Sequence, residues 1–190
     1  MLFPPAGKAF VNASQQAAMG MNEDRNIVLI GMPGVGKSTV GVLLAKRMGY
    51  DFLDTDILIQ AREGRSLQEI IRAEGARRFR ALEEEYICDV QCTAHVIATG
   101  GSVVYSDRAM AHLARSGTVV FLDISLERLL HRLDDVDARG VVRAPGQTIA
   151  DLYDERYPLY RRHHDIAVRT DGLAPNQVLA AILRRLPGLP

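Results

Sequence analysis

One short segment near the start of the chain restricts the possible folds more than any other. Gly31 to Ser38 read Gly-Met-Pro-Gly-Val-Gly-Lys-Ser, which matches the phosphate-binding pattern G-x-x-x-x-G-K-[ST] at every fixed position. An apolar run predicts a buried strand over Asn26 to Ile30, and the spacing predicts a helix over Lys37 to Met48 that ends at Gly49. Because this pattern is specific when it lies between a strand and a helix, the segment predicts a P-loop.

The residue types in this loop indicate what it binds. Glycines let the backbone turn its N–H groups inward, where side chains would block a phosphate, and the helix start adds a positive dipole end. Lys37 is expected to reach the β- and γ-phosphates of a nucleoside triphosphate, and the Ser38 hydroxyl is expected to bind Mg²⁺. The predicted nucleotide-binding residues of the loop are Gly34, Val35, Gly36, Lys37, Ser38 and Thr39.

The rest of the chain alternates between predicted strands and predicted helices. Further strands are expected over Asp51–Asp56, His95–Thr99, Thr118–Asp123 and Asp165–Val168. Helices are expected over 66–75, 77–92, 107–115, 125–133 and 175–185, and a further helix is expected to begin at Thr148. Several of them begin at a residue type that caps helices. This alternation predicts an α/β fold, a three-layer sandwich with a five-stranded parallel sheet.

Length and charge limit the remaining possibilities. At 190 residues the chain suits one compact domain, expected over residues 25–190, with a polar segment at about 134–147. Residues 1–24 lack periodicity, so we expect them to be disordered or to precede the native start. Basic and acidic residues balance at 23 each, which argues against nucleic acid or membrane as a partner. No apolar run is long enough to span a bilayer and the first residues do not resemble a signal peptide, so we expect a cytoplasmic protein, and we also expect a monomer. Cys88 and Cys92 are too few ligands for a metal site.

The molecule that receives the phosphoryl group also needs a binding site. Asp54 and Asp56 lie at the predicted carboxyl end of the second strand, where open α/β sheets bind ligands, and alternate residues of a strand share a face. Asp56 could instead simply cap the next helix. Asp123 ends another predicted apolar strand, as a Walker B aspartate does, and is therefore another candidate for binding the metal. The pattern leaves the choice between Asp54 and Asp123 open.

Separated motifs then indicate a family. The chain resembles shikimate kinases, which have the P-loop fold of the nucleoside-monophosphate-kinase type. The resemblance rests on "GMPGVGKST" (31–39), "FLDTD" (52–56), "FRALE" (79–83), "VIATGG" (96–101) and "ERYPLY" (155–160), in the family's order and spacing from residue 26 to residue 186. It implies transfer of the γ-phosphoryl group of ATP to the 3-hydroxyl of shikimate, with Mg²⁺, in aromatic amino-acid biosynthesis.

The resemblance also implies roles for particular residues. Lys37, Asp56 and a lid arginine are the implied catalytic residues, and Asp54 with Ser38 is implied to place Mg²⁺. The implied substrate-binding residues are Asp56, Arg80, Gly100, Gly101 and Arg156, the two arginines holding the shikimate carboxylate and the glycines offering N–H groups. The resemblance implies a lid at about 134–147, in which Arg139 aligns best with the family's lid arginine and Arg143 is the next best match. It also implies that Arg132 flanks the adenine.

Two departures from the family pattern bear on the substrate. Ser102 stands where the family has a third glycine, and the lid reads Arg-Gly-Val-Val-Arg over 139–143 in place of Arg-Pro-Leu-Leu. A kinase of another small hydroxy acid or alcohol, such as gluconate or homoserine, is therefore an alternative. A non-catalytic ATP-binding module is a second alternative, which the presence of Asp56, Arg80 and Arg156 disfavours.

Overall fold

The computed structural model describes residues 25–134 and 146–187. Its sheet has five parallel strands in the order β2-β3-β1-β4-β5. The strands are β1 (Asn26–Ile30), β2 (Asp51–Asp54), β3 (His95–Ala98), β4 (Gly117–Asp123) and β5 (Ile166–Arg169). The helices are α2 (Lys37–Met48), α3 (Thr55–Glu63), α4 (Leu67–Cys88), α5 (Asp107–Ser116), α6 (Leu126–Asp134), α7 (Ile149–Arg162) and α8 (Pro175–Leu183), with a short 3₁₀ helix η1 (Val103–Tyr105). The predicted five-stranded parallel α/β fold is confirmed.

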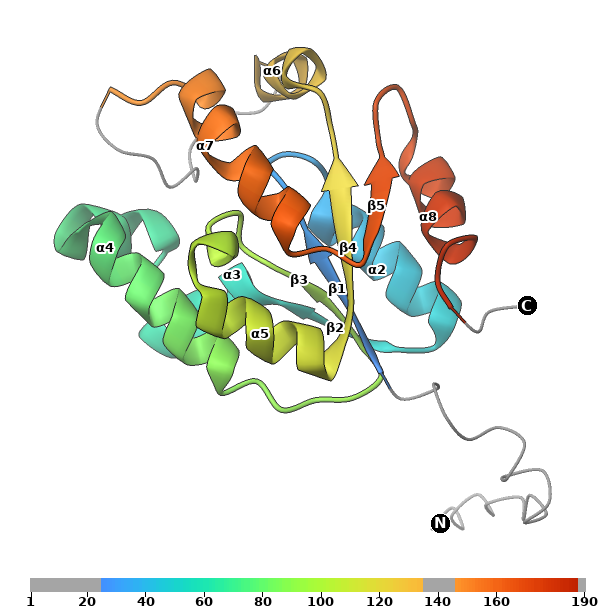
Figure 1. Ribbon diagram of the computed structural model, residues 1–190. Helices are drawn as coiled ribbons and strands as arrows, with labels where there is room; N and C mark the ends of the chain where they lie inside the picture. The colour runs from blue at the N-terminus through green and yellow to red at the C-terminus, as the bar shows by residue number, and fades with distance from the viewer. Residues whose placement is uncertain (1–24, 135–145, 188–190) are drawn as a thin grey trace, which may run out of the picture.

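Helices cover both faces of the sheet, which makes the molecule a three-layer sandwich. Figure 1 shows α2 and α8 together on one face and α5 with α7 on the other, while α3 and α4 extend beyond the β2 edge. All five strands run in the same direction, so their carboxyl ends meet at one edge of the sheet. The P-loop, the start of α3 and the loop after β3 therefore lie together at that edge.

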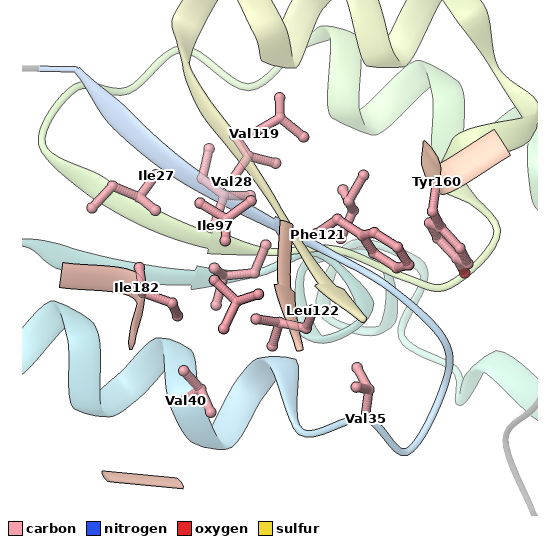
Figure 2. Close-up of a cluster of buried hydrophobic side chains, with 14 of the residues drawn as sticks. Ile27, Val28, Val35, Val40, Ile97, Val119, Phe121, Leu122, Tyr160 and Ile182 are labelled. Carbon is pink, nitrogen blue, oxygen red and sulfur yellow. The ribbon is translucent and has the colours of Figure 1, made fainter. Parts of the chain in front are cut away.

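The core explains why the central strands read as continuous apolar runs. Every residue of β1 is buried, because both of its faces are covered by helices. Figure 2 shows the strand residues Val28 and Phe121 with Val40 of α2 and Ile182 of α8. The Tyr160 ring of α7 stacks on Phe121, with ring centroids 5.3 Å apart. The edge strands β2 and β5 are only partly buried.

Most helix starts follow the predicted capping chemistry. The capping boxes of Ser66 with Glu69 and of Thr148 with Asp151 are both formed. Ser106 caps α5 by accepting a hydrogen bond from the Ala109 N–H. The cap therefore lies one residue before Asp107, where the predicted helix begins. Across the described ranges, no helix has the length and apolar character needed to cross a bilayer.

Two predicted boundaries were wrong. The second strand ends at Asp54, so Asp56 belongs to the first turn of α3 and the two carboxylates do not share an extended segment. The helix predicted to end at Cys92 ends at Cys88. In both cases the side-chain pattern continues past a backbone change that it does not encode. The predicted break at Gly75 is present: with φ 82° and ψ 162° this residue is not helical, and two helical segments meet there at a kink within α4.

Asn26 joins two segments of the sheet that are far apart in sequence. Its side chain is buried, its Nδ2 donates to the Cys92 carbonyl at 2.8 Å, and its Oδ1 accepts from the His95 N–H at 3.0 Å. These bonds fix the segment that enters β3 against the start of β1. Both backbone groups would lose their partner if the amide were removed.

We expect Asn26→Ala to lower the free energy of unfolding by about 3 kcal/mol, because buried polar groups left unpaired lose their hydrogen bond without regaining water. Urea denaturation measures this change. Asn176→Ala, the same truncation at an exposed position of α8, should change stability by less than about 0.5 kcal/mol. Equal effects of the two substitutions would show that the Asn26 bonds do not stabilise the sheet.

Candidate functional site

The P-loop presents the start of α2 without a side-chain cap. Gly36 occupies the N-cap position in a left-handed conformation, with φ 100°, and no side chain accepts from the first N–H groups of this helix. The first turn also contains no acidic residue, whereas α3, α4, α5 and α7 each begin with a side-chain cap. Unpaired N–H groups at a positive helix end are suited to an anion such as a phosphate.

The other loop residues shape this cradle. Ser38 and Thr39 are exposed in the first turn of α2, and Gly34 is exposed in the loop. Val35 is buried, and its N–H donates to the Met32 carbonyl at 3.2 Å, so its side chain anchors the loop in the core. Among the residues predicted to bind the nucleotide, Gly34, Ser38 and Thr39 are thus exposed, while the Val35 side chain is buried and holds the loop.

Lys37 is almost completely buried in the middle of the site. Its Nζ donates to the carbonyls of Gly31 at 2.8 Å and Met32 at 3.0 Å. Burial lowers the pKa of Lys37 to about 8, against the opposing effect of nearby carboxylates, of which Asp56 is the largest. The ammonium group is therefore held beside the loop, within a region of balanced positive and negative charge.

Ser38 and Asp54 come together as a pair of oxygen ligands. Ser38 Oγ donates to Asp54 Oδ2 at 2.6 Å, while Asp54 Oδ1 accepts from the Asp56 and Ile57 N–H groups and so caps α3. Hydroxyl and carboxylate oxygens suit Mg²⁺, which takes few protein ligands and completes its shell with phosphates and water. Residues 25–134 and 146–187 contain no group of three or more His, Cys, Asp or Glu placed to hold a metal.

The competing carboxylate, Asp123, has a different environment. Its Oδ2 lies 3.3 Å from Arg169 Nη1 at the ends of β4 and β5. An arginine already neutralises it, whereas Asp54 faces the P-loop serine. The geometry therefore favours Asp54 over Asp123 as the residue near a metal.

Asp56 lies on the side of the site where the phosphate acceptor is expected to bind. It follows the Asp54 cap in the first turn of α3, and burial raises the pKa of its carboxyl above the usual range, while Lys37 opposes that shift. A small pocket lies beside it, lined also by Pro33, Leu67, Phe79, Gly100, Gly101, Ser102 and Arg156. A partly desolvated carboxylate in a pocket can accept a proton from a bound hydroxyl group.

Gly100 contributes space to this pocket. Its N–H donates to Thr55 Oγ1 at 2.9 Å, so the expectation that it offers this group to a ligand is not met here. A Cβ at Gly100 would lie 2.3 Å from Glu83 Oε1 and 2.7 Å from Asp56 Oδ1. A side chain there would displace both carboxylates, which explains the glycine.

The two predicted carboxylate-binding arginines converge from different helices. Arg80 extends from α4 and Arg156 from α7, and the Cζ atoms lie 4.0 Å and 5.2 Å from the centroid of the Tyr105 ring. Arg156 is 1% exposed, so its charge is held almost entirely out of water. Within the described ranges the Nε of Arg80 is buried and has no hydrogen-bond partner. Sequence alone would class Arg80 as a surface helix charge, and the structure places it at the site.

Sequence reasoning missed the role of Glu83. This residue is 2% exposed, and one of its oxygens accepts from Ser102 Oγ at 2.5 Å. Burial raises the pKa of Glu83 to about 7, while the Ser102 hydroxyl and the two arginines favour the charged form. Ser102, the departure from the family's third glycine, lines the pocket and donates its hydroxyl to this buried carboxylate. The quoted "FRALE" motif contained Glu83, but a helix glutamate gives no sequence signal of burial.

The remaining candidates fall into two groups. Arg132 Nη1 donates to the Val35 carbonyl at 2.8 Å, which places this side chain against the P-loop. The lid arginine Arg139, its alternative Arg143, the leader over 1–24 and most of the predicted lid lie outside the described residues.

The raised pKa of Glu83 predicts a pH-dependent stability. The folded protein holds this proton up to about pH 7, while the unfolded chain releases it near 4.5, so the stabilisation present below pH 4.5 is lost as pH rises through about 7. Between about pH 5 and about pH 8, the unfolding free energy of the wild type should therefore fall by on the order of 3 kcal/mol relative to Glu83→Gln.

Urea denaturation of both proteins at the two pH values measures this difference. Glu85→Gln, an exposed change on the same helix, is the matched control and should follow the wild type. A gap between wild type and Glu83→Gln that stays constant with pH would show that Glu83 does not titrate in this range.

Comparisons with known proteins agree with this geometry. The family model described as shikimate kinase matches residues 33–187. A shikimate kinase from Mycobacterium avium is 42% identical over 164 residues, covering 84% of this chain and 92% of its own, and one from Thermodesulfovibrio yellowstonii is 38% identical over 163 residues, covering 84% and 94%. The solved structure of the Acinetobacter baumannii shikimate kinase in complex with shikimate superposes with a TM-score of 0.73 at 33% identity, covering 84% of this chain and 91% of that one. The chain therefore belongs to the shikimate kinase family.

Proposed function

We propose that this chain is a shikimate kinase that transfers the γ-phosphoryl group of ATP to the 3-hydroxyl of shikimate, giving shikimate 3-phosphate and ADP. The observation that carries the proposal is a pocket beside the P-loop that is lined by Asp56 and Arg156, with Arg80 and Arg156 both at the ring of Tyr105. An acidic residue and two guanidinium groups match a ligand that has hydroxyls at one end and a carboxylate at the other.

The nucleotide occupies the P-loop side in this proposal. Unpaired N–H groups at the start of α2 bind the phosphate oxygens, and Lys37 leaves the loop carbonyls to contact the β- and γ-phosphates. Ser38 and Asp54 would hold Mg²⁺, Asp54 through water, and when bound this ion neutralises charge on the phosphates. Arg132 is proposed to flank the adenine, and Arg139 to close over the phosphates from the lid.

The acceptor occupies the other side. Asp56 binds the hydroxyls of shikimate and accepts the proton of the attacking hydroxyl, an assignment supported by its burial and raised pKa. Arg80 and Arg156 bind the carboxylate as two planar forks. Gly101 lines the pocket, and its carbonyl accepts from the Tyr160 hydroxyl at 2.6 Å, which fixes the backbone there.

The alternatives are disfavoured by the same contacts. Homoserine carries a carboxylate but also an ammonium group, which would lie among cations if its carboxylate bound Arg80 and Arg156. Gluconate has a carboxylate and hydroxyls, so it is the stronger rival, and substrate comparison separates it. A non-catalytic module would not need a partly buried acidic residue, Asp56, beside the phosphate site. The predicted monomeric state and cytoplasmic location stay predictions.

Release of ADP by the purified protein with ATP and Mg²⁺ tests the proposal. Shikimate should stimulate this release far more than gluconate, homoserine or no acceptor, because the proposal assigns the hydroxyl side and the carboxylate side of the pocket to shikimate. A coupled spectrophotometric assay measures the rate, and phosphorus NMR of the product locates the phosphate.

Asp56→Asn is the control for contaminating kinases, and it should lower the shikimate-dependent kcat by at least about 100-fold while ATP still binds. Stimulation by gluconate or homoserine alone would replace the proposed substrate. Binding of ATP with no stimulation by any acceptor would support the non-catalytic module.

A further inference from the structure

Tyr105 touches both arginines of the acceptor site. Arg80 Cζ lies 4.0 Å from the centroid of its ring, and Arg156 Nε donates to its hydroxyl at 3.1 Å. Arg156 Cζ is 5.2 Å from the same centroid. One aromatic side chain thus contacts two guanidinium groups from two different helices, through its face and through its hydroxyl.

The two arginines need such a contact because their charges repel each other. The electron-rich face of an aromatic ring attracts a guanidinium group, and this attraction does not depend on whether the neighbouring Glu83 is protonated. Arg80 also borders a hollow of about 200 Å³, lined by Glu83, Ser102 and Tyr105 among others. The side chain therefore has free space beside it, and the contact of its guanidinium group with the Tyr105 ring limits its orientation.

The segment that carries Tyr105 is firmly attached. Val103 and Val104 of η1 are each 1% exposed and belong to the core. The Tyr105 N–H donates to the Ser102 carbonyl at 3.0 Å, and the next residue, Ser106, caps α5. The ring therefore projects from a rigid turn that also carries the Ser102 contact to Glu83. A rigid support can hold two flexible side chains in a fixed relative position.

We propose that Tyr105 is a positioning residue, which holds Arg80 and Arg156 in the arrangement that binds the acceptor carboxylate. This inference rests on the proposed function. It predicts that Tyr105 sets the affinity for the carboxylate end of the acceptor and has little influence on ATP or on the chemical step at Asp56.

Two variants separate the two contacts. Tyr105→Phe keeps the ring and removes the hydroxyl, and we expect the KM for shikimate to rise about fivefold with kcat within about twofold of wild type. Tyr105→Leu also removes the ring face, and the KM should rise about 20-fold. The KM for ATP should stay unchanged in both. Tyr153→Phe, which removes a hydroxyl bonded to the Ile124 carbonyl at 2.9 Å, is the matched control and should leave the KM for shikimate unchanged.

The methyl ester of shikimate tests whether the effect depends on the carboxylate, because the ester keeps the hydroxyls and lacks the charge. The Tyr105 variants should lower kcat/KM for shikimate several-fold more than kcat/KM for the ester. Equal losses for both acceptors, or a parallel rise in the KM for ATP, would show a general structural role and overturn the inference. Unchanged shikimate kinetics in both variants would overturn it as well.

A wild-type protein without shikimate-dependent ADP release would overturn the proposed function, and the inference with it. The wild-type rate in the same assay therefore distinguishes the two failures. Circular dichroism melting of each variant checks folding, and Tyr105→Phe, the smaller change, keeps the test valid if Tyr105→Leu does not fold.

Discussion

The buried charges at the carboxyl edge of the sheet must balance, and the arrangement of the site depends on this balance. Lys37 and Arg156 are 8% and 1% exposed, and Glu83 is 2% exposed. An isolated charge at such burial would be very costly, so each one requires opposite charges nearby. Asp56, Asp54 and Glu83 all favour the charged form of Lys37, and Arg156 favours the charged form of Glu83.

The fold supplies this balance by bringing distant segments to one place. The parallel strands direct the P-loop, the start of α3 and the loop after β3 to the same edge, while α4 and α7 add an arginine each. The proposed ligands would extend the same balance, since phosphates bring negative charge to Lys37 and a carboxylate brings it to the arginines. Each ligand would thus bind beside cationic groups whose positive charge is not fully neutralised by the nearby carboxylates.

Much of the fold could be predicted because its signals are local. The P-loop pattern fixes β1 and α2 to the residue, and apolar runs identify the central strands. The end of β2 was misplaced because Asp54 caps α3, and a polar residue after a strand does not reveal which of two acids begins the helix. The break at Gly75 could be predicted, because a glycine in a helical pattern marks a backbone change at that residue.

The candidate site was predicted less completely than the fold. Lys37, Asp56, Arg80 and Arg156 could be named from motifs, and the structure brings them together. Glu83, Ser102 and Tyr105 could not be assigned, because their roles come from contacts across 19 to 51 positions of sequence. Ser102 in particular reads as a lost glycine in the sequence, whereas in the structure its hydroxyl partners a buried carboxylate.

The most direct test of the central assignment, that Arg80 and Arg156 bind the acceptor carboxylate while Asp56 binds its hydroxyls, is a crystal structure of the protein with ADP, Mg²⁺ and shikimate. The account predicts that the shikimate carboxylate lies within hydrogen-bonding distance of both guanidinium groups, with the 3-hydroxyl at Asp56 and facing the P-loop. A carboxylate bound at Lys37 or at the surface, with Arg80 and Arg156 unoccupied, would contradict it.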